Sequence, residues 1–401
     1  MSVKEQLKLE ILSDGVNLNC PPASNELEIS IIGPGYGECI IIHLGGERWL
    51  IVDSCIDVFT REPAALAYFK KIQVNPADSV KQVIATHWHD DHIRGFADTF
   101  EACSSAQLVL SEALKLDEML QLVSEGTRTM VNSSGVNELH DVVKILLDRK
   151  KKKVPNDVPV FAVQGNRIWD SSVQILGSTT ARCEIFSLSP SHSAILASKI
   201  EFAKLLPDIA KRPKRWVRSI DPNHAAVAIR LQIGSFSVLL GADLEEDGNP
   251  QTGWSAVISS YSPQDGKSSM FKVPHHGSNT GHHPKVWEEM LAGEPIAVLT
   301  PFQMAGTNLP TKEDVCRLKQ LTPNCFITAR PGKRTVKRDH AVEKMIKEVA
   351  KSISVLDALS GQVRIRFKTA DFATIELFGD ARILDLPAEQ TYVSHKKSKH
   401  K

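Results

Sequence analysis

The chain has 401 residues, of which 42% are hydrophobic and 24% are charged, and its formal net charge at pH 7 is +1. These values predict a globular protein with a large core and argue against a molecule that binds polyanions over its whole surface. No apolar run is long enough to span a bilayer, and charges occupy the N-terminus where a signal peptide needs an apolar stretch. Seven cysteines without a Cys-x-x-Cys pair favour a reducing compartment, so we expect a cytoplasmic protein with no membrane contact.

Apolar strands alternate with helical segments up to about residue 110, which predicts the first half of a sandwich of two sheets covered by helices. Helical periodicity then predicts an inserted region over about 111–155, which can act as a lid. A strand-rich second half starts near Val158.

The C-terminal part predicts a helix from Asp339 to Lys351, followed by strands over 363–367 and 374–378. The tail over 395–401 is basic, and we expect it to be disordered.

The most informative segment is Thr86–His92, which packs three imidazoles and two carboxylates into seven residues directly after an apolar run. Neutral imidazole and carboxylate are ligands that zinc and similar divalent metals prefer. His87 and His89 are two residues apart in an extended exit from a strand, so they point the same way. Asp91 and His92 lie at the turn into a helix and point elsewhere. The loop is therefore expected to serve two adjacent metals.

This loop resembles the His-x-His-x-Asp-His loop of the metallo-β-lactamase superfamily, whose members are two-metal hydrolases. The runs 31–42 and 49–55 look like that superfamily's opening hairpin. The runs 223–243 and 273–278 look like the soluble hydrolase domain of the ComEC competence proteins and their relatives, which include phosphorylcholine esterases. The resemblance covers roughly residues 28 to 330 and implies an α/β fold, a four-layered αββα sandwich.

The resemblance also implies a division of the chain. Residues 1–27 form an N-terminal extension or edge strand, and residues 28–333 form the hydrolase domain with its helical insertion. Residues 334–394 supply a C-terminal helix and strands that complete the sandwich, ahead of the basic tail.

The metal ligands follow from the same resemblance. His87 and His89 are expected to hold the first metal, Asp91 and His92 the second, and Asp243 is expected to bridge the two. The implied cofactor is a pair of divalent ions, with zinc the first choice and manganese the alternative.

Two ligand assignments stay open. We favour His276 as the last ligand of the second metal and His275 as a group near the scissile bond, although the order can be reversed. His192 offers the remaining ligand of the first metal, but Pro190 sits where the strand should end and can keep it out of reach. Asp53 is expected to orient a ligand or, alternatively, to end a strand.

The implied mechanism uses a metal-bridging hydroxide that attacks a phosphorus or carbonyl centre. Asp91 is expected to orient that hydroxide, and His275 to give a proton or hydrogen bond to the departing oxygen. The backbone N–H groups of Gly277 and Ser278 can contact a phosphate oxygen.

The first hypothesis for the substrate is nucleic acid, cleaved by a phosphodiesterase. A basic run interleaved with an aromatic ring can bind backbone phosphates and stack on a base; it consists of Lys211, Arg212, Lys214, Arg215, Trp216 and Arg218. A second basic cluster covers Arg149 to Lys153. Both clusters can equally be solvated loops.

Two further hypotheses remain. The enzyme can act on a small phosphodiester or another ester, with the lid closing a pocket. It can instead be a subunit of a multi-protein complex with a mainly structural metal site. ComEC-like hydrolases of this kind can be encoded beside partner proteins in bacterial defence systems. The oligomeric state cannot be inferred from the sequence.

Overall fold

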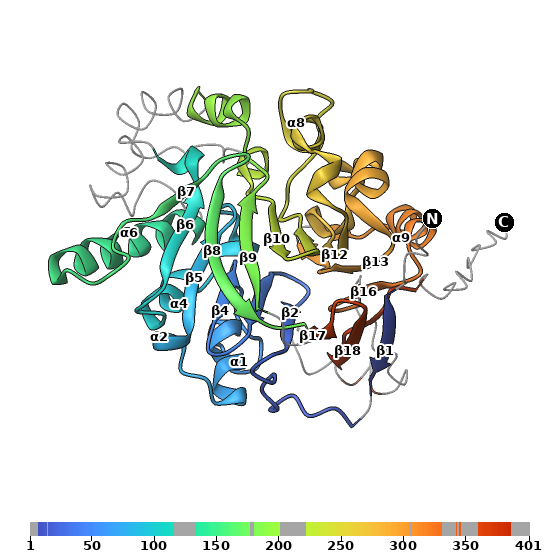
Figure 1. The fold of residues 1–401 in the computed structure, drawn as a ribbon, viewed down its shortest axis with the longest axis horizontal. Coiled ribbons are helices and arrows are strands. Elements are labelled where there is room, and N and C mark those ends of the chain that lie inside the picture. The colour runs from blue at the N-terminus through green and yellow to red at the C-terminus, as the bar shows by residue number, and fades with distance from the viewer. Residues whose placement is uncertain are drawn as a thin grey trace.

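The structure, a computed structural model, describes residues 7–13, 15–115, 134–176, 180–200, 222–304, 306–330, 342, 345 and 360–385. Two large sheets, with helices on their outer faces, make up most of this part of the chain (Figure 1).

The first sheet is mixed, and its central strands come from the N-terminal part of the chain. In spatial order its nine strands are β1 (Lys8–Leu12), β18 (Phe372–Gly379), β17 (Gly361–Thr369), β2 (Leu27–Gly33), β3 (Cys39–Leu44), β4 (Trp49–Val52), β5 (Val80–Ala85), β6 (Gln107–Ser111) and β7 (Val160–Ala162). Strands β4 to β7 run parallel to one another.

The second sheet is built from the rest of the chain. In spatial order its eight strands are β19 (Arg382–Ile383), β16 (Cys325–Ile327), β13 (Leu291–Leu299), β12 (Ser268–Lys272), β11 (Phe236–Leu240), β10 (Ile229–Ile233), β9 (Thr180–Ser187) and β8 (Arg167–Gln174). Strands β11, β12, β13 and β16 are parallel neighbours. A separate hairpin joins β14 (Phe302–Met304) to β15 (Thr307–Leu309).

The helices cover the outer faces of both sheets. On the first sheet lie α1 (Ala64–Ile72), α2 (Pro76–Ser79), α3 (Asp90–Ile93), α4 (Phe96–Ala102) and α6 (Ser134–Lys152), and on the second lie α8 (Gly253–Ser260) and α9 (Lys312–Leu321). Within the described residues, no helix combines the length and the apolar character needed to cross a membrane.

Alternation along the strands divides the apolar side chains between layers. In β2 and β3, Ile31 and Ile40 join the cluster between the sheets, whereas Ile32 and Ile41 join the cluster under the helices. Successive side chains of a strand point to opposite faces, so a strand that is apolar on both faces must be covered on both. These runs therefore need two layers of cover, and the sandwich supplies them.

Three apolar clusters define the four layers. The first lies between the sheets, the second packs α1, α4 and α6 on the nine-stranded sheet, and the third packs α8 and α9 on the eight-stranded sheet. The predicted αββα sandwich is thus confirmed.

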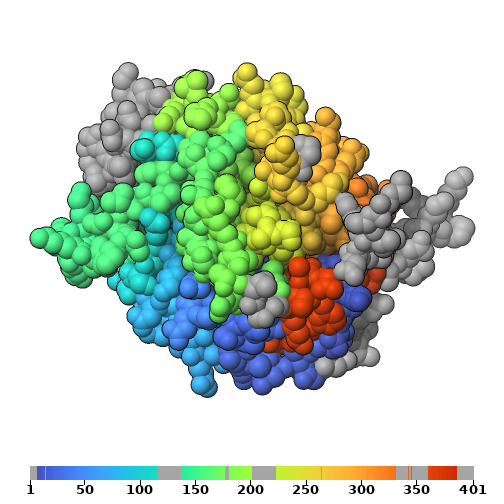
Figure 2. All heavy atoms as spheres, viewed as in Figure 1, coloured from blue at the N-terminus to red at the C-terminus, as the bar shows by residue number. Residues whose placement is uncertain are grey.

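The C-terminal strands complete the first sheet. Strand β17 pairs antiparallel with β2, and β18 pairs with both β17 and the edge strand β1. Figure 2 shows the red C-terminal residues lying directly against the blue N-terminal ones. Strands β17 and β18 cover the ranges 363–367 and 374–378 predicted from the sequence, and β1 lies in the predicted N-terminal edge strand.

The predicted insertion over 111–155 has a different place in the structure. Residue 111 ends β6, and α6 connects β6 to its parallel neighbour β7. Parallel strands require a crossover connection, usually a helix, so α6 belongs to the sandwich itself. Residues 116–133, like the predicted helix 339–351, the basic run 211–218 and the tail 395–401, lie outside the described residues, apart from single positions at 342 and 345.

The basic cluster at the end of α6 divides into two parts. Lys150 to Lys153 are exposed, but Arg149 is only 6% exposed. Its guanidinium donates to the carbonyl oxygens of Phe100, Cys103 and Ala106 and lies 3.8 Å from the centre of the Phe100 ring. The prediction that Arg149 belongs to a phosphate-binding surface is therefore wrong, because its N–H groups are already bonded to carbonyl oxygens at and just after the end of α4.

Replacing Arg149 with Met is expected to lower the free energy of unfolding by about 2–3 kcal/mol, because buried carbonyl groups lose a charged donor. Urea denaturation followed by circular dichroism measures this change. The matched variant Lys152→Met, three residues along the helix, should stay within about 0.5 kcal/mol of the wild type. Equal effects of the two variants would contradict the interior role of Arg149.

Candidate metal centre

The first half of the site is built at the ends of two parallel strands. Strand β4 ends at Val52 and its neighbour β5 at Ala85, so the residues that follow each strand meet at one edge of the sheet. Asp53 accepts hydrogen bonds from the backbone N–H of Thr86 at 2.8 Å and from its hydroxyl at 2.7 Å. The chain then passes through His87 and enters α3.

The second half follows the parallel strands β11, β12 and β13 in the same way. Asp243 comes three residues after β11, His276 four residues after β12, and Thr300 directly after β13. Ala242 and His276 have positive φ values of 47° and 54°. Non-glycine residues seldom adopt this conformation, and its occurrence where the donors are presented is typical of a functional site.

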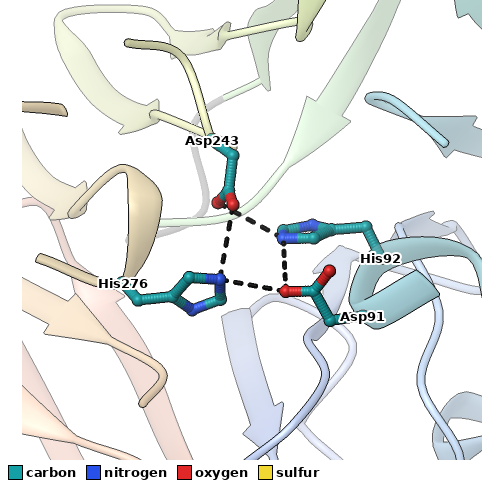
Figure 3. A group of neighbouring side chains, drawn as sticks. All are labelled: Asp91, His92, Asp243 and His276. Atoms are coloured by element: carbon teal, nitrogen blue, oxygen red, sulfur yellow. Dashed lines mark hydrogen bonds and ion pairs between the residues drawn. The ribbon is translucent and has the colours of Figure 1, made fainter. Parts of the chain in front are cut away.

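Four side chains from the two halves meet in a buried group. Asp91 and His92 come from α3, and Asp243 and His276 face them from the other sheet (Figure 3). Nε2 of His276 lies 3.1 Å from Oδ2 of Asp91 and 3.3 Å from Oδ2 of Asp243. Nε2 of His92 lies 3.2 Å from Oδ1 of Asp243 and 3.7 Å from Oδ2 of Asp91. One donor atom from each residue lies within 4.8 Å of the other three.

A second group shares His92 with the first and adds Asp53 and His87. Nδ1 of His92 lies 2.7 Å from Oδ2 of Asp53, which fixes the ring and leaves Nε2 facing Asp243. Nδ1 of His87 lies 2.9 Å from the Thr86 hydroxyl. Asp53 therefore fixes the orientation of the His92 ring. Carboxylates that hydrogen-bond to metal-ligating histidines have this role in known metal sites.

Two predicted ligands of the first metal lie outside both groups. The partly exposed His89 ring lies edge-on to His87 with centroids 5.1 Å apart. His192 is exposed at the start of a helical segment over 192–200, after Ser191 has bonded the carbonyl of Gln251. The structure does not bring His192 to the group, because the chain turns into this helix directly after Pro190.

The buried donors fit a divalent metal. Nε2 of His87 is buried and makes no hydrogen bond within the described part of the chain, whereas Nε2 of His92 and Oδ1 of Asp243 have only each other as close partners at 3.2 Å. Buried polar atoms are normally bonded, so an imidazole nitrogen left without a partner beside this His–Asp group fits a bound ion. Burial and the nearby histidines lower the pKa of His87 well below its usual value. His87 is therefore neutral, the form that binds metal.

A buried ion pair that the sequence analysis missed supports Asp243. Lys272 is fully buried, with Nζ 2.7 Å from Oε2 of Glu38 and 3.9 Å from Oδ1 of Asp243. The Thr300 hydroxyl donates to the same Glu38 oxygen at 2.6 Å, and Nδ1 of His276 lies 3.1 Å from the Thr300 carbonyl. This network joins both sheets behind the donors. In the sequence, the sign of this ion pair is a lysine at the end of the apolar strand that precedes His275 and His276.

His275 and His276 have different surroundings. His276 belongs to the donor group, whereas Nδ1 of His275 lies 2.8 Å from Oε1 of Glu245 and 2.8 Å from the hydroxyl of Thr280. Burial alone would raise the pKa of Glu245, but His275 outweighs it and holds this pKa below its usual value. Glu245, a second residue missed in the sequence, therefore orients His275.

The predicted phosphate contact at Gly277 and Ser278 is not available. The N–H of Gly277 donates to the Pro274 carbonyl at 3.0 Å, and that of Ser278 donates to the His275 carbonyl at 2.9 Å. The Ser278 hydroxyl accepts from the N–H of Thr280. These groups close the turn that presents the two histidines, so the prediction is wrong.

An aromatic pair borders the donors. The Tyr36 and Phe302 rings lie 5.5 Å apart, and Phe302 lies 5.2 Å from the His276 ring. Both are partly exposed. Burial, Asp91 and Asp90 raise the pKa of Tyr36, so its hydroxyl stays protonated. The pair thus forms an aromatic border to the metal centre.

Comparison with known families fits this geometry. Residues 32–155, which include the whole loop from Thr86 to His92, match the family described as the metallo-beta-lactamase superfamily. The chain contains a metallo-β-lactamase superfamily domain. Together with the donor group, this match supports a metal-dependent hydrolase.

Solved structures resemble the domain distantly. A metallo-β-lactamase of Cronobacter sakazakii with a HARLDQ motif is 13% identical over 61% of this chain and 76% of that one, with a TM-score of 0.32. MIM-1 from Novosphingobium pentaromativorans is 12% identical over 70% and 87%, with a TM-score of 0.30. None of the curated proteins matches the chain. The assignment therefore rests on residues 32–155 and not on these likenesses.

Metal binding to the metallo-β-lactamase domain is expected to release protons. Burial alone would lower the pKa of His276, but Asp243 and Asp91 raise it to about 9. Below that pH a metal must displace the proton of His276, so the apparent affinity of the site for the metal should rise with pH by up to about tenfold per pH unit through this proton. Calorimetric titration with zinc in buffers of different ionisation enthalpy measures the release. An affinity independent of pH would contradict a ligand role for His276.

Proposed function

We propose that the domain hydrolyses phosphodiesters as a ComEC-like member of the superfamily. The motif resemblance supports the substrate class, and the placement of His275 carries the proposal. Its side chain is 20% exposed beside the donor group, and its Nδ1 is held by Glu245. Its Nε2 makes no hydrogen bond within the described residues. This nitrogen is therefore the one that remains to face a substrate.

Phosphodiester hydrolysis expels an alkoxide, which leaves slowly unless it receives a proton. His275 can donate that proton from Nε2, because Glu245 and Thr280 fix the ring through Nδ1. Metals held by the donor group would lower the pKa of a bound water and so supply the nucleophile. His276 would therefore bind metal, and His275 would face the leaving group.

The leaving-group dependence of a His275→Ala variant tests this role. Expulsion of an alkoxide from a dinucleotide needs the proton, whereas expulsion of nitrophenolate from bis(p-nitrophenyl) phosphate does not. We expect the dinucleotide kcat to fall by about 10²- to 10⁴-fold, the usual contribution of a general acid, and the aryl diester kcat to fall far less.

Two controls accompany this assay, with manganese and zinc compared. His283→Ala removes a nearby histidine that is not in the donor group and should leave both rates unchanged. Asp243→Asn should abolish both. Equal losses on the two substrates in His275→Ala would contradict the proton-donor role, and no hydrolysis of any phosphodiester by the metal-loaded protein would contradict the proposed function.

The aromatic border favours substrates that carry a base or an aryl group. Phe302 lies beside His276 and Tyr36 lies beside Phe302, so a ring next to the scissile phosphate can stack on this pair. The exposed Lys150 to Lys153 are available for phosphates, although they lie at the end of α6 away from the metal loop. Nucleic acid is therefore our first choice of substrate, with a small phosphodiester second. A place beside partner proteins in a bacterial defence or DNA-processing system remains a prediction.

A Tyr36→Leu variant is expected to raise KM for a dinucleotide roughly 5- to 100-fold, because stacking on one base contributes about 1–3 kcal/mol. Steady-state kinetics on the dinucleotide and on an abasic analogue separates stacking from a general defect. The abasic substrate should show the wild-type KM. The same increase on both substrates would contradict stacking.

A further inference from the structure

Helix α6 begins against the loop that carries the metal donors. The N–H of Gly135, in its first turn, donates to Oδ1 of Asp90 at 2.9 Å. One turn further on, the two carboxylate oxygens of Glu138 accept from the N–H groups of Gly95 at 2.8 Å and Ala97 at 3.1 Å. These partners lie at the start of α3 and α4. The helix therefore holds the segment that follows β5 at two points.

The approach of α6 to this loop is closer than any side chain permits. A Cβ placed on Gly135 would lie 2.1 Å from the carbonyl oxygen of Trp88 and 3.2 Å from its carbonyl carbon. Trp88 stands between His87 and His89 in the chain, and its side chain packs in the same apolar cluster as Leu139 of α6. Gly135 is not among the residues with positive φ. It is needed for the close approach and not for an unusual backbone conformation.

We propose that Gly135 and Glu138 are positioning residues that set the geometry of the metal loop. Gly135 lets the helix backbone press against the peptide between His87 and His89, while Glu138 ties the N–H groups of Gly95 and Ala97. Among the described residues, the hydrogen-bond partners of these two residues are Asp90, Gly95 and Ala97, none of which is a metal donor. The proposal goes beyond the proposed function, because it requires only the metal centre and no particular substrate.

Alanine at position 135 should not have the stabilising effect that it usually has in a helix. Alanine has a higher helix propensity than glycine, so Gly→Ala within a helix ordinarily stabilises a protein. At Gly135 the new methyl group must displace the Trp88 carbonyl. A backbone carbonyl shifts only at a cost, and it shifts least easily when the loop is also held by its metal ligands. The substitution should therefore destabilise the metal-bound protein more than the metal-free protein, which weakens metal binding.

The test compares Gly135→Ala with Gly293→Ala in the full chain. Gly293 lies in β13, is exposed, and has open space around the position of a Cβ. Calorimetric titration of the metal-free proteins with zinc gives affinities, and the absorption bands of bound cobalt report ligand geometry. We expect Gly135→Ala to bind zinc roughly 10- to 100-fold more weakly, as loss of a partner behind a metal site does, and to shift the cobalt bands. Gly293→Ala should match the wild type in both.

Thermal melting of the metal-free and zinc-loaded proteins separates a positioning role from a structural one. Under the proposal, Gly135→Ala lowers the melting temperature of the zinc-loaded protein by more than that of the metal-free protein, whereas a purely structural role would lower both equally. Wild-type zinc affinity and cobalt bands in this variant would overturn the proposal, whatever its melting temperature.

If Gly135→Ala does not fold, Glu138→Gln keeps the proposal testable. Glutamine retains one acceptor oxygen, so one of the two N–H groups at the start of α4 loses its partner. Weaker zinc binding with shifted cobalt bands would support the positioning role. Unchanged values would overturn it.

Discussion

Asp91 and Asp243 are both buried, and both lie within hydrogen-bond distance of the same nitrogen of His276. Two carboxylates this close in a poorly solvated site repel each other unless positive charge lies between them. In the metal-free site the protons of His92 and His276 supply part of that charge, and Lys272 supplies more from behind Asp243. A bound divalent ion would take the place of those protons. Because the two aspartates come from opposite sheets, this compensation also fixes how the halves of the sandwich face each other.

The fold meets this requirement through its parallel strands. Donors follow the carboxyl end of β5 in one sheet and the carboxyl ends of β11 and β12 in the other, so short loops suffice to bring them together. The groups that support the donors come from the neighbouring strands: Asp53 follows β4, which lies beside β5, and Thr300 follows β13, which lies beside β12. The C-terminal strands β17 and β18 and the edge strand β1 then complete the first sheet.

Features that depend on local sequence patterns could be predicted from the sequence. Dense His and Asp spacing marked the loop from His87 to His92, and the apolar run before Asp243 placed that carboxylate at a strand end. The layers followed from strand and helix periodicity together with the resemblance. These features depend on neighbours in the chain, which a single sequence displays.

Contacts between distant segments could not be predicted in the same way. Nothing near Glu38 indicates that Lys272 will neutralise it, and the lysine-rich end of α6 gave no sign that Arg149 turns inward to cap α4. The turn after His276 shows the same limit, since the N–H groups of Gly277 and Ser278 looked available until their carbonyl partners were known. His192 was one of two open possibilities for the remaining ligand position, and the helix that starts there places it on the surface.

The central claim is that Asp91, His92, Asp243 and His276 hold a divalent metal. Anomalous diffraction at the zinc edge, from crystals of the zinc-loaded protein, tests it most directly. The account predicts a peak among these four side chains, with ligand distances of about 2.0–2.2 Å to the nitrogen and oxygen donors. Zinc bound elsewhere, with the four side chains paired only to one another, would contradict it.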